Sequence, residues 1–115
     1  MKTIVADDED MICHVLTAMF ERSGHKVITA TTAEQAIAAF DREPDTDLVL
    51  TDFQMGPTGT GLDVCRHVRA TSTGTRSCLM SGKLSPDVIK EASALGVSTL
   101  AKPFTPRELH EAIGF

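Results

Sequence analysis

The sequence predicts an α/β fold in which five strand–helix units form a doubly wound, five-stranded parallel sheet. Short apolar runs alternate with segments of helical periodicity, and residues typical of turns and helix ends separate them. Strict alternation favours a parallel sheet covered by helices on both faces through right-handed crossovers. At 115 residues with 42% hydrophobic content, the chain suits one core, so we expect residues 1–115 to form a single domain.

Five runs of four or five residues are expected to be the strands, because they are short and rich in Val, Ile, Leu and Thr. In chain order they are TIVA (3–6), KVITA (26–30), DLVLT (47–51), SCLM (77–80) and STLA (98–101).

The segment after each run carries apolar residues at the three- and four-residue spacing of one helix face. In chain order the five helices are marked by Ile12, Val15, Leu16, Met19 and Phe20; by Ala33, Ala36, Ile37 and Phe40; by Leu62, Cys65 and Val68; by Val88, Ala92 and Leu95; and by Leu109, Ala112 and Ile113.

Helix-end signals agree with these boundaries. Gly24 follows the first helix and Gly96 follows the fourth, as expected for glycine just beyond a helix end. Ser85-Pro86 supplies a cap and a first-turn proline for the fourth helix. Thr105 and Glu108 have the spacing of a capping box at the start of the fifth.

Composition excludes several function classes. The net charge is −5, and no cluster of Lys and Arg overrides it, so binding to nucleic acid or to an anionic membrane is not expected. No apolar run has the roughly 18 residues of a transmembrane helix, and the acidic N-terminal stretch does not resemble a signal peptide. We therefore expect a cytoplasmic protein. Cys13, Cys65 and Cys78 fall in apolar segments without zinc-site spacing, and we expect reduced core thiols.

Polar residues follow four of the five predicted strands. Asp7 and Asp8 come after the first, Asp52 after the third, Ser81 after the fourth and Lys102 after the fifth. In an open parallel sheet, ligands bind outside the carboxyl ends of the strands, at the switch in strand order. The five side chains are therefore expected to share one edge of the sheet.

A purely structural role is also possible for each of these residues. Asp8, Glu9 and Asp10 could simply favour the positive N-terminal end of the first helix, and Asp52 could accept hydrogen bonds in a turn. The conjunction of carboxylates, a hydroxyl and an ammonium group at one sheet edge favours a functional site. Crowded carboxylates repel one another, so something at this edge must offset that repulsion.

The motifs VADDED, LVLTDFQM, LMSG and LAKPF, in this order, resemble those of bacterial response regulator receiver domains, of the CheY-like superfamily, over essentially the whole chain. The resemblance implies a flavodoxin-like sheet with strand order 2-1-3-4-5 and a phosphoacceptor at Asp52. Asp7, Asp8, Asp52 and the backbone carbonyl of Gln54 would bind Mg²⁺. Ser81 and Lys102 would contact the phosphoryl group, and Lys102-Pro103 would be a cis peptide.

The resemblance further implies phosphorylation by a histidine kinase or phosphotransfer protein in a two-component system or phosphorelay. The domain would catalyse only its own phosphorylation and dephosphorylation, so we do not expect an enzyme in the usual sense. Phosphorylation would shift a two-state equilibrium through Ser81 and the loop of Lys102. The altered surface, formed by the fourth helix, fifth strand and fifth helix, would bind a downstream protein that the sequence does not identify.

Several residues depart from the receiver pattern. Thr99 stands at the switch position, where receivers usually carry Tyr or Phe, and the loop FQMGPTGTGLDV carries one residue more than usual, with Gly61 in the place of the family's glycine before the third helix. Gln54 and Lys83 stand where side chains modulate the lifetime of the phosphoryl group. For Lys83, a solvated side chain without such a role remains equally open.

Two other function classes compete with this interpretation. A phosphohydrolase resembling haloacid dehalogenases would also use Mg²⁺ and an aspartate nucleophile, but it needs a second Asp where this chain has Gln54. A receiver fold that works as an interaction module without phosphorylation stays open because of Thr99 and the altered loop. The presence of the aspartates, Ser81 and Lys102 together argues against that alternative.

Overall fold

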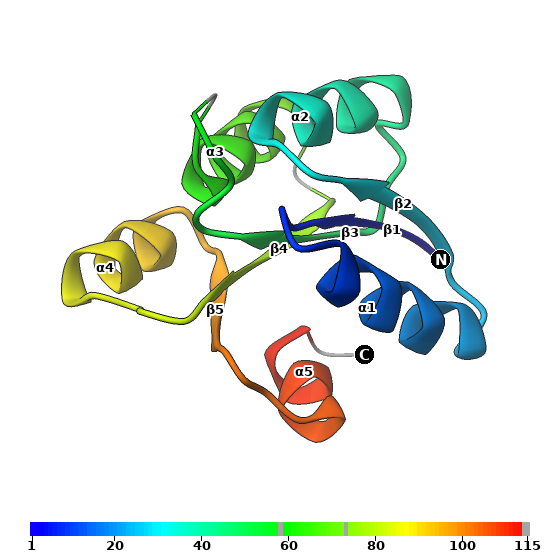
Figure 1. The fold of residues 1–115 in the computed structure, drawn as a ribbon. Helices are drawn as coiled ribbons and strands as arrows, with labels where there is room; N and C mark the ends of the chain where they lie inside the picture. Colours follow the sequence, from blue (N-terminus) through cyan, green and yellow to red (C-terminus); the bar gives the residue numbers. More distant parts are fainter. Residues whose placement is uncertain (58, 73, 114–115) are drawn as a thin grey trace.

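The computed structural model describes residues 1–57, 59–72 and 74–113 (Figure 1). Five strands alternate with five helices along the chain, as predicted. The strands are β1 (Lys2–Ala6), β2 (Lys26–Ala30), β3 (Leu48–Asp52), β4 (Arg76–Ser81) and β5 (Ser98–Ala101). The helices are α1 (Asp10–Arg22), α2 (Ala33–Arg42), α3 (Gly61–Thr71), α4 (Pro86–Ala94) and α5 (Pro106–Ile113).

The strands form one parallel sheet in the order β2-β1-β3-β4-β5, which confirms the expected topology. Every residue of β3 is buried, because this strand lies at the centre of the sheet with helices on both faces. The boundaries differ from the prediction by one residue at the site. Asp52 and Ser81 are the last residues of β3 and β4 instead of the first loop residues.

Alternate residues of the strands face two different helical layers. On one face, Ile4 and Val49 pack with buried residues of α2 and α3, and Leu79 packs with residues of α3 and α4. On the other face, Val5 and Leu50 pack with α1 and α5. Figure 1 shows this arrangement, with α2 and α3 above the sheet and α1 and α5 below it.

The predicted helix ends are confirmed. Gly24 and Gly96 adopt positive φ angles of 85° and 72°, which suit glycine. The Ser85 side chain accepts a hydrogen bond from the Val88 backbone N–H, and Thr105 and Glu108 cap each other reciprocally.

The apolar face of α1 is narrower than its sequence pattern indicates. Its buried stripe consists of Cys13, Leu16 and Phe20, whereas Met11 is 76% and Val15 is 54% exposed. The spacing of Val15 fits a helix, but its side chain lies on the outer margin of the stripe.

The three cysteines are buried free thiols, as expected. Burial raises the pKa of Cys65 and of Cys78 to about 12. None of the helices within residues 1–57, 59–72 and 74–113 combines the length and apolar content needed to cross a bilayer.

Candidate functional site

Three carboxylates meet at the carboxyl ends of β1 and β3. Asp7 and Asp8 follow β1, and Asp52 ends β3, so the pairing of these two strands places the groups side by side. One carboxylate oxygen from each lies within 4.8 Å of the others. Asp7 is fully buried, Asp52 is 8% exposed and Asp8 is exposed, so the cluster opens to solvent on the side of Asp8.

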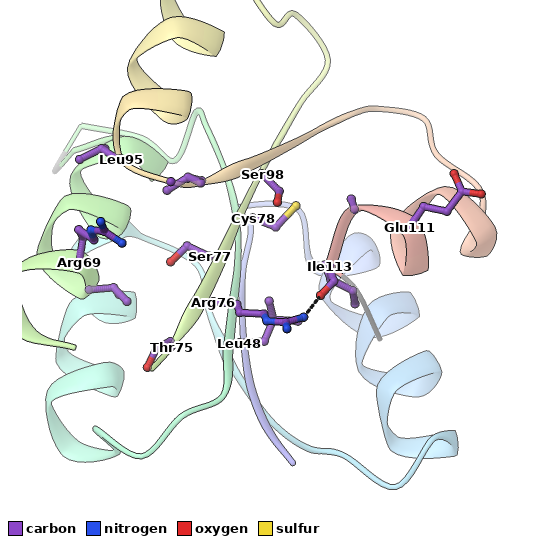
Figure 2. Close-up of a pocket in the computed structure, with 14 residues that line it drawn as sticks. Leu48, Arg69, Thr75, Arg76, Ser77, Cys78, Leu95, Ser98, Glu111 and Ile113 are labelled. Atoms are coloured by element: carbon purple, nitrogen blue, oxygen red, sulfur yellow. Dashed lines mark hydrogen bonds between the residues drawn. The ribbon is translucent and has the colours of Figure 1, made fainter. Parts of the chain in front are cut away.

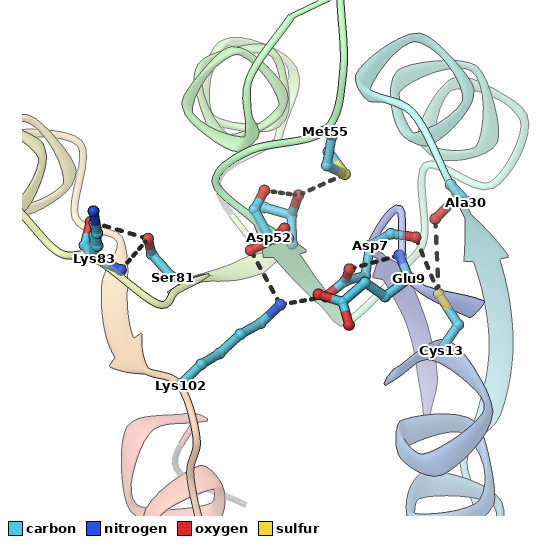
Figure 3. Close-up of polar contacts among 10 residues, drawn as sticks. Asp7, Glu9, Cys13, Ala30, Asp52, Met55, Ser81, Lys83 and Lys102 are labelled. Atoms are coloured by element: carbon cyan, nitrogen blue, oxygen red, sulfur yellow. Dashed lines mark hydrogen bonds and ion pairs between the residues drawn. The ribbon is translucent and has the colours of Figure 1, made fainter. Parts of the chain in front are cut away.

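Lys102 brings a positive charge into this cluster from the end of β5. Its ammonium nitrogen lies 2.6 Å from Oδ2 of Asp7 and 3.2 Å from Oδ1 of Asp52 (Figure 3). Burial and the charge of Asp7 raise the pKa of Asp52, and Lys102 opposes that shift only in part. Burial lowers the pKa of Lys102, but its hydrogen bond to Asp7 and the charges of both aspartates leave that pKa above its ordinary value.

Two contacts fix Asp7 in its buried position. The backbone N–H of Glu9 donates a 2.9 Å hydrogen bond to Oδ1 of Asp7. The thiol of Cys13, on α1, donates to the carbonyl oxygen of Asp7 over 3.3 Å. The N-terminal turn of α1 therefore supports the acidic loop that precedes it.

The backbone of Asp52 is held by close packing against α3. Gly61, the first residue of α3, donates its N–H to the carbonyl oxygen of Phe53 at 2.8 Å. A Cβ atom at Gly61 would lie 2.2 Å from the carbonyl oxygen of Asp52 and 2.7 Å from Cδ1 of Leu79. Only glycine fits at this position without a shift of β3 or α3.

The loop between Asp52 and Gly61 is anchored by Met55. This side chain is 1% exposed, and its sulfur accepts a 3.7 Å hydrogen bond from the hydroxyl of Thr51. Gln54, whose carbonyl is predicted to bind Mg²⁺, is exposed and pairs with Thr60 in an isolated antiparallel bridge. The extra residue expected in this loop cannot be followed throughout, since Thr58 lies outside the described residues.

The hydroxyl of Ser81 is engaged with the backbone of Lys83. It accepts a 3.1 Å hydrogen bond from the N–H of Lys83 and donates one of 3.0 Å to its carbonyl oxygen (Figure 3). The residue is 5% exposed and ends β4, beside Lys102 at the end of β5. Thr99, which the resemblance places at the switch position, is half-buried in β5 and pairs in register with Leu79.

The outer surface of α3 makes two contacts that the sequence pattern does not indicate, an ion pair and a histidine–carboxylate hydrogen bond. Arg66 contacts Glu91 of α4 at 2.7 Å, and Nε2 of His67 lies 2.6 Å from Oδ1 of Asp41 in α2. The sequence identifies Arg66 and His67 only as polar residues on an amphipathic helix, because the partners lie about 25 residues away along the chain.

The donor set of the cluster fits Mg²⁺. Carboxylate oxygens are hard ligands, the three groups are close enough to share one ion, and Asp8 leaves an open side for the waters that Mg²⁺ retains. Lys102 alone leaves net negative charge among the three carboxylates, so a bound divalent cation would be favoured electrostatically.

Comparison with known proteins gives a consistent family assignment. The sensory/regulatory protein RpfC of Xanthomonas campestris pv. campestris is 31% identical over 118 residues, covering 98% of this chain and 16% of RpfC. Sporulation initiation phosphotransferase F of Bacillus subtilis is 28% identical over 113 residues, covering 97% of this chain and 90% of that protein.

The solved structures agree with the curated relatives. The crystal structure of a response regulator receiver domain protein from Clostridium thermocellum is 28% identical, with a TM-score of 0.89, covering 98% of this chain and 90% of that chain. The family model described as response regulator receiver domain matches residues 3–114. Because this match spans nearly the whole chain, the protein belongs to the response regulator receiver domain family of two-component signalling systems.

Proposed function

We propose that this chain is a cytoplasmic, phosphorylation-controlled receiver in which Asp52 accepts a phosphoryl group from a phosphohistidine on a kinase or phosphotransfer protein. The observation that carries the proposal is the position of Lys102, whose ammonium group contacts both Asp7 and Asp52. The similarity to a protein named a phosphotransferase supports the same conclusion.

In the proposed reaction a carboxylate oxygen of Asp52 attacks phosphorus, and the bond between phosphorus and the imidazole nitrogen breaks. The imidazole leaves with the bonding electron pair, and Asp52 becomes an acyl phosphate. Positioning and charge stabilisation supply most of the catalysis in phosphoryl transfer, so a shallow site without a general base suffices. Lys102 would stabilise the negative charge of the phosphoryl oxygens, and water later hydrolyses the product.

Asp7, Asp8 and Asp52 would hold Mg²⁺, together with the carbonyl of Gln54. When bound, the cation would screen the negative charge of the site and of the incoming phosphoryl group. Asp7 has the further role of orienting Lys102, since it makes the shorter of the two ion pairs.

Signal output would depend on Ser81. Its hydroxyl can contact a phosphoryl group on Asp52 only after it leaves the backbone of Lys83. That exchange would draw the loops after β4 and β5 inward and change the surface formed by α4, β5 and α5, where a downstream protein would bind. Within α4 only Ala92 is buried, so this helix is weakly held.

Intact mass after incubation with acetyl phosphate and Mg²⁺ tests the phosphoacceptor. We expect one phosphoryl adduct on the wild-type protein, none without Mg²⁺ and none on Asp52→Asn. Asp10→Asn, which removes an exposed carboxylate from the same acidic stretch, is the matched control and keeps the adduct. A folded wild-type protein that never gains the adduct contradicts the proposal and favours a phosphorylation-independent interaction module.

The decay of the adduct tests the lifetime residues. Gln54 and Lys83 are exposed and stand two residues after Asp52 and Ser81. We propose that their side chains flank the path of the hydrolytic water, so Gln54→Ala and Lys83→Ala change the decay rate. Lys90→Ala, on the exposed surface of α4, is the control. Equal decay rates in all three variants and the wild type would show that neither Gln54 nor Lys83 controls the lifetime of the phosphoryl group.

A further inference from the structure

The outer edge of β2 is open to a further strand. β2 stands at one end of the strand order β2-β1-β3-β4-β5, and no other strand of the described residues pairs with its outer edge (Figure 1). Lys26 and Ala30, at its two ends, make backbone hydrogen bonds with residues 1–7 on the inner side. Successive residues of a strand turn their backbone groups to opposite sides, so the N–H and C=O groups of Val27 and Thr29 point outward. Such unpaired backbone groups are a template for another strand.

A groove of about 540 Å³ runs along this edge, between α1 and β2. Thr29 lines it from β2 and pairs in register with Val5, which packs on the α1 side of the sheet, so both walls lie on one face. The α1 wall contains a single stripe of residues three or four positions apart: Asp10, His14, Thr17 and Glu21. The hydroxyl oxygen of Thr17 is buried and has no hydrogen-bond partner among the described residues. The wall therefore contains a polar group that its own neighbours leave unsatisfied.

The charge of this groove is negative. Asp10 and Glu21 stand near its two ends, and neither carboxylate forms an ion pair with a described residue. None of the described residues that line the groove is Lys or Arg. Lys26 belongs to β2, but Ile28, two positions further on, packs towards α2, so Lys26 points to that opposite face as well. The groove therefore suits a positively charged ligand.

The separation of the two carboxylates suits an extended peptide. Glu21 follows Asp10 by 11 positions in the sequence, which is about 16 Å along the axis of α1. The helix runs alongside β2 in the opposite direction, because the sulfur of Cys13 lies 4.0 Å from the carbonyl oxygen of Ala30, while residues 23–25 connect the far end of α1 to the start of β2. Residues four positions apart on an added strand would be about 13 Å apart on the same side. Two long basic side chains at that spacing can reach both carboxylates.

The opposite face of the same edge is apolar. Ile28 of β2 and Ile37 of α2 are half-buried and pack against the core between the sheet and α2. Side chains on an added strand alternate between the two faces of the sheet. The surface therefore fits a segment in which basic residues alternate with apolar ones.

The polar hollow at the amino ends of β3 and β4 differs from this groove, because charged side chains that line it are engaged within the chain. Nη1 of Arg76 donates a 2.9 Å hydrogen bond to the carbonyl oxygen of Ile113 (Figure 2). The carboxylate of Glu111 lies 3.5 Å from Nε of Arg107. The carboxylates beside β2 have no such partners among the described residues.

We propose that β2 binds an extended segment of a partner protein as a sixth strand, with its basic side chains in the acidic groove and its apolar side chains beside Ile28 and Ile37. Backbone hydrogen bonds with Val27 and Thr29 would supply affinity, and the groove would supply specificity. A second copy of this chain fits less well. Two-fold pairing of β2 with itself would bring two acidic grooves onto the same face of one sheet, where like charges repel.

Titration with synthetic peptides, followed by amide chemical shifts in NMR, tests this surface. The probe is the capped peptide Ser-Lys-Val-Thr-Val-Lys-Ser, and the charge control carries Glu in place of both Lys. Two further forms are N-methylated on one or the other set of alternate amides, which removes the donors on one edge of the peptide. We expect saturable shifts of the Val27 and Thr29 amides with the lysine peptide, clearly weaker binding of the glutamate peptide, and loss of binding in one N-methylated form.

Glu21→Gln and Asp87→Asn form a matched pair of variants. Each removes one exposed carboxylate, but Asp87 belongs to α4 and does not line the groove. Loss of one exposed ion pair should weaken binding of the lysine peptide about two- to fivefold in Glu21→Gln and leave Asp87→Asn unchanged. The titration uses unphosphorylated protein in EDTA, so its outcome is independent of the reaction proposed at Asp52.

Four results would overturn the proposal. They are equal affinity of the two variants for the lysine peptide, equal binding of the lysine and glutamate peptides, full binding of both N-methylated forms, and the absence of saturable shifts at Val27 and Thr29. Self-association of the free protein through β2, seen by sedimentation, would assign the edge to a second copy of the chain instead.

Discussion

Replacement of Gly61 by alanine is the sharpest test of how the fold positions Asp52, the proposed phosphoacceptor. The new Cβ would lie 2.2 Å from the Asp52 carbonyl oxygen and 2.7 Å from Cδ1 of Leu79. Ordinary contact begins at about 3.4 Å, so β3 and α3 would have to separate by roughly 1 Å. Overpacking of a core costs about 1–3 kcal/mol, and a clash with backbone belongs at the upper end.

Because Gly61 is the first residue of α3, the propensity gain of alanine in a helix interior offsets little of this cost, so we expect a net loss of about 2–3 kcal/mol in the free energy of unfolding. Urea denaturation measures it, and acetyl phosphate labelling should slow because Asp52 moves. Gly74→Ala is the control, since nothing lies within 4 Å of the Cβ position there. If Gly61→Ala matched Gly74→Ala in both stability and labelling rate, the close-packing argument would fail.

Three further predictions concern the charged site and the buried thiols. Lys102→Gln leaves buried Asp7 without its ammonium partner, so we expect the free energy of unfolding in EDTA to fall by about 1–3 kcal/mol and to be largely restored by Mg²⁺; an equal loss with and without Mg²⁺ would contradict this. Because the pKa of Asp52 is raised in the folded protein, its ionisation lowers the free energy of unfolding at pH values above that pKa. Below the ordinary pKa of 3.8, Asp52 is protonated in both the folded and the unfolded protein, and this destabilisation disappears. Asp52→Asn should therefore be more stable than the wild type in EDTA at pH 7, with a difference that shrinks as the pH falls towards 4; a pH-independent difference would refute this cause. Because the pKa of Cys65 and of Cys78 is about 12, both thiols should resist iodoacetamide at pH 8 in the folded protein and react in urea, as mass spectrometry can check; rapid labelling without urea would contradict the burial argument.

The fold and the meeting of Asp7, Asp52 and Lys102 at one sheet edge could be predicted from sequence, because the alternation of strands and helices implies both. Alternating runs specify parallel strands, and parallel strands bring the residues at their ends together, so Asp7, Asp52 and Lys102 meet although 95 positions separate the first from the last. The finer contacts could not be predicted in this way. The hydrogen bonds of Ser81 with Lys83 depend on a side-chain rotamer, and periodicity does not specify rotamers.

The sequence pattern also could not predict the contacts between helices. Arg66 contacts Glu91 only because α3 and α4 pack at a particular rotation about their axes. The exposure of Val15 has the same origin, since a small rotation of α1 decides which residues at the margin of its apolar stripe touch the sheet.

The hydrogen bond from Cys13 to the carbonyl of Asp7 joins the hydrophobic core to the cluster of three aspartates. Substitutions that repack the buried face of α1 would therefore also shift the backbone of Asp7, even when every charged residue is left in place. If Asp52 accepts a phosphoryl group as proposed, variants selected only for melting temperature can lose that reaction while remaining fully folded. Screening α1 libraries for labelling by acetyl phosphate as well as for stability would separate tolerant core positions from those that support the chemistry.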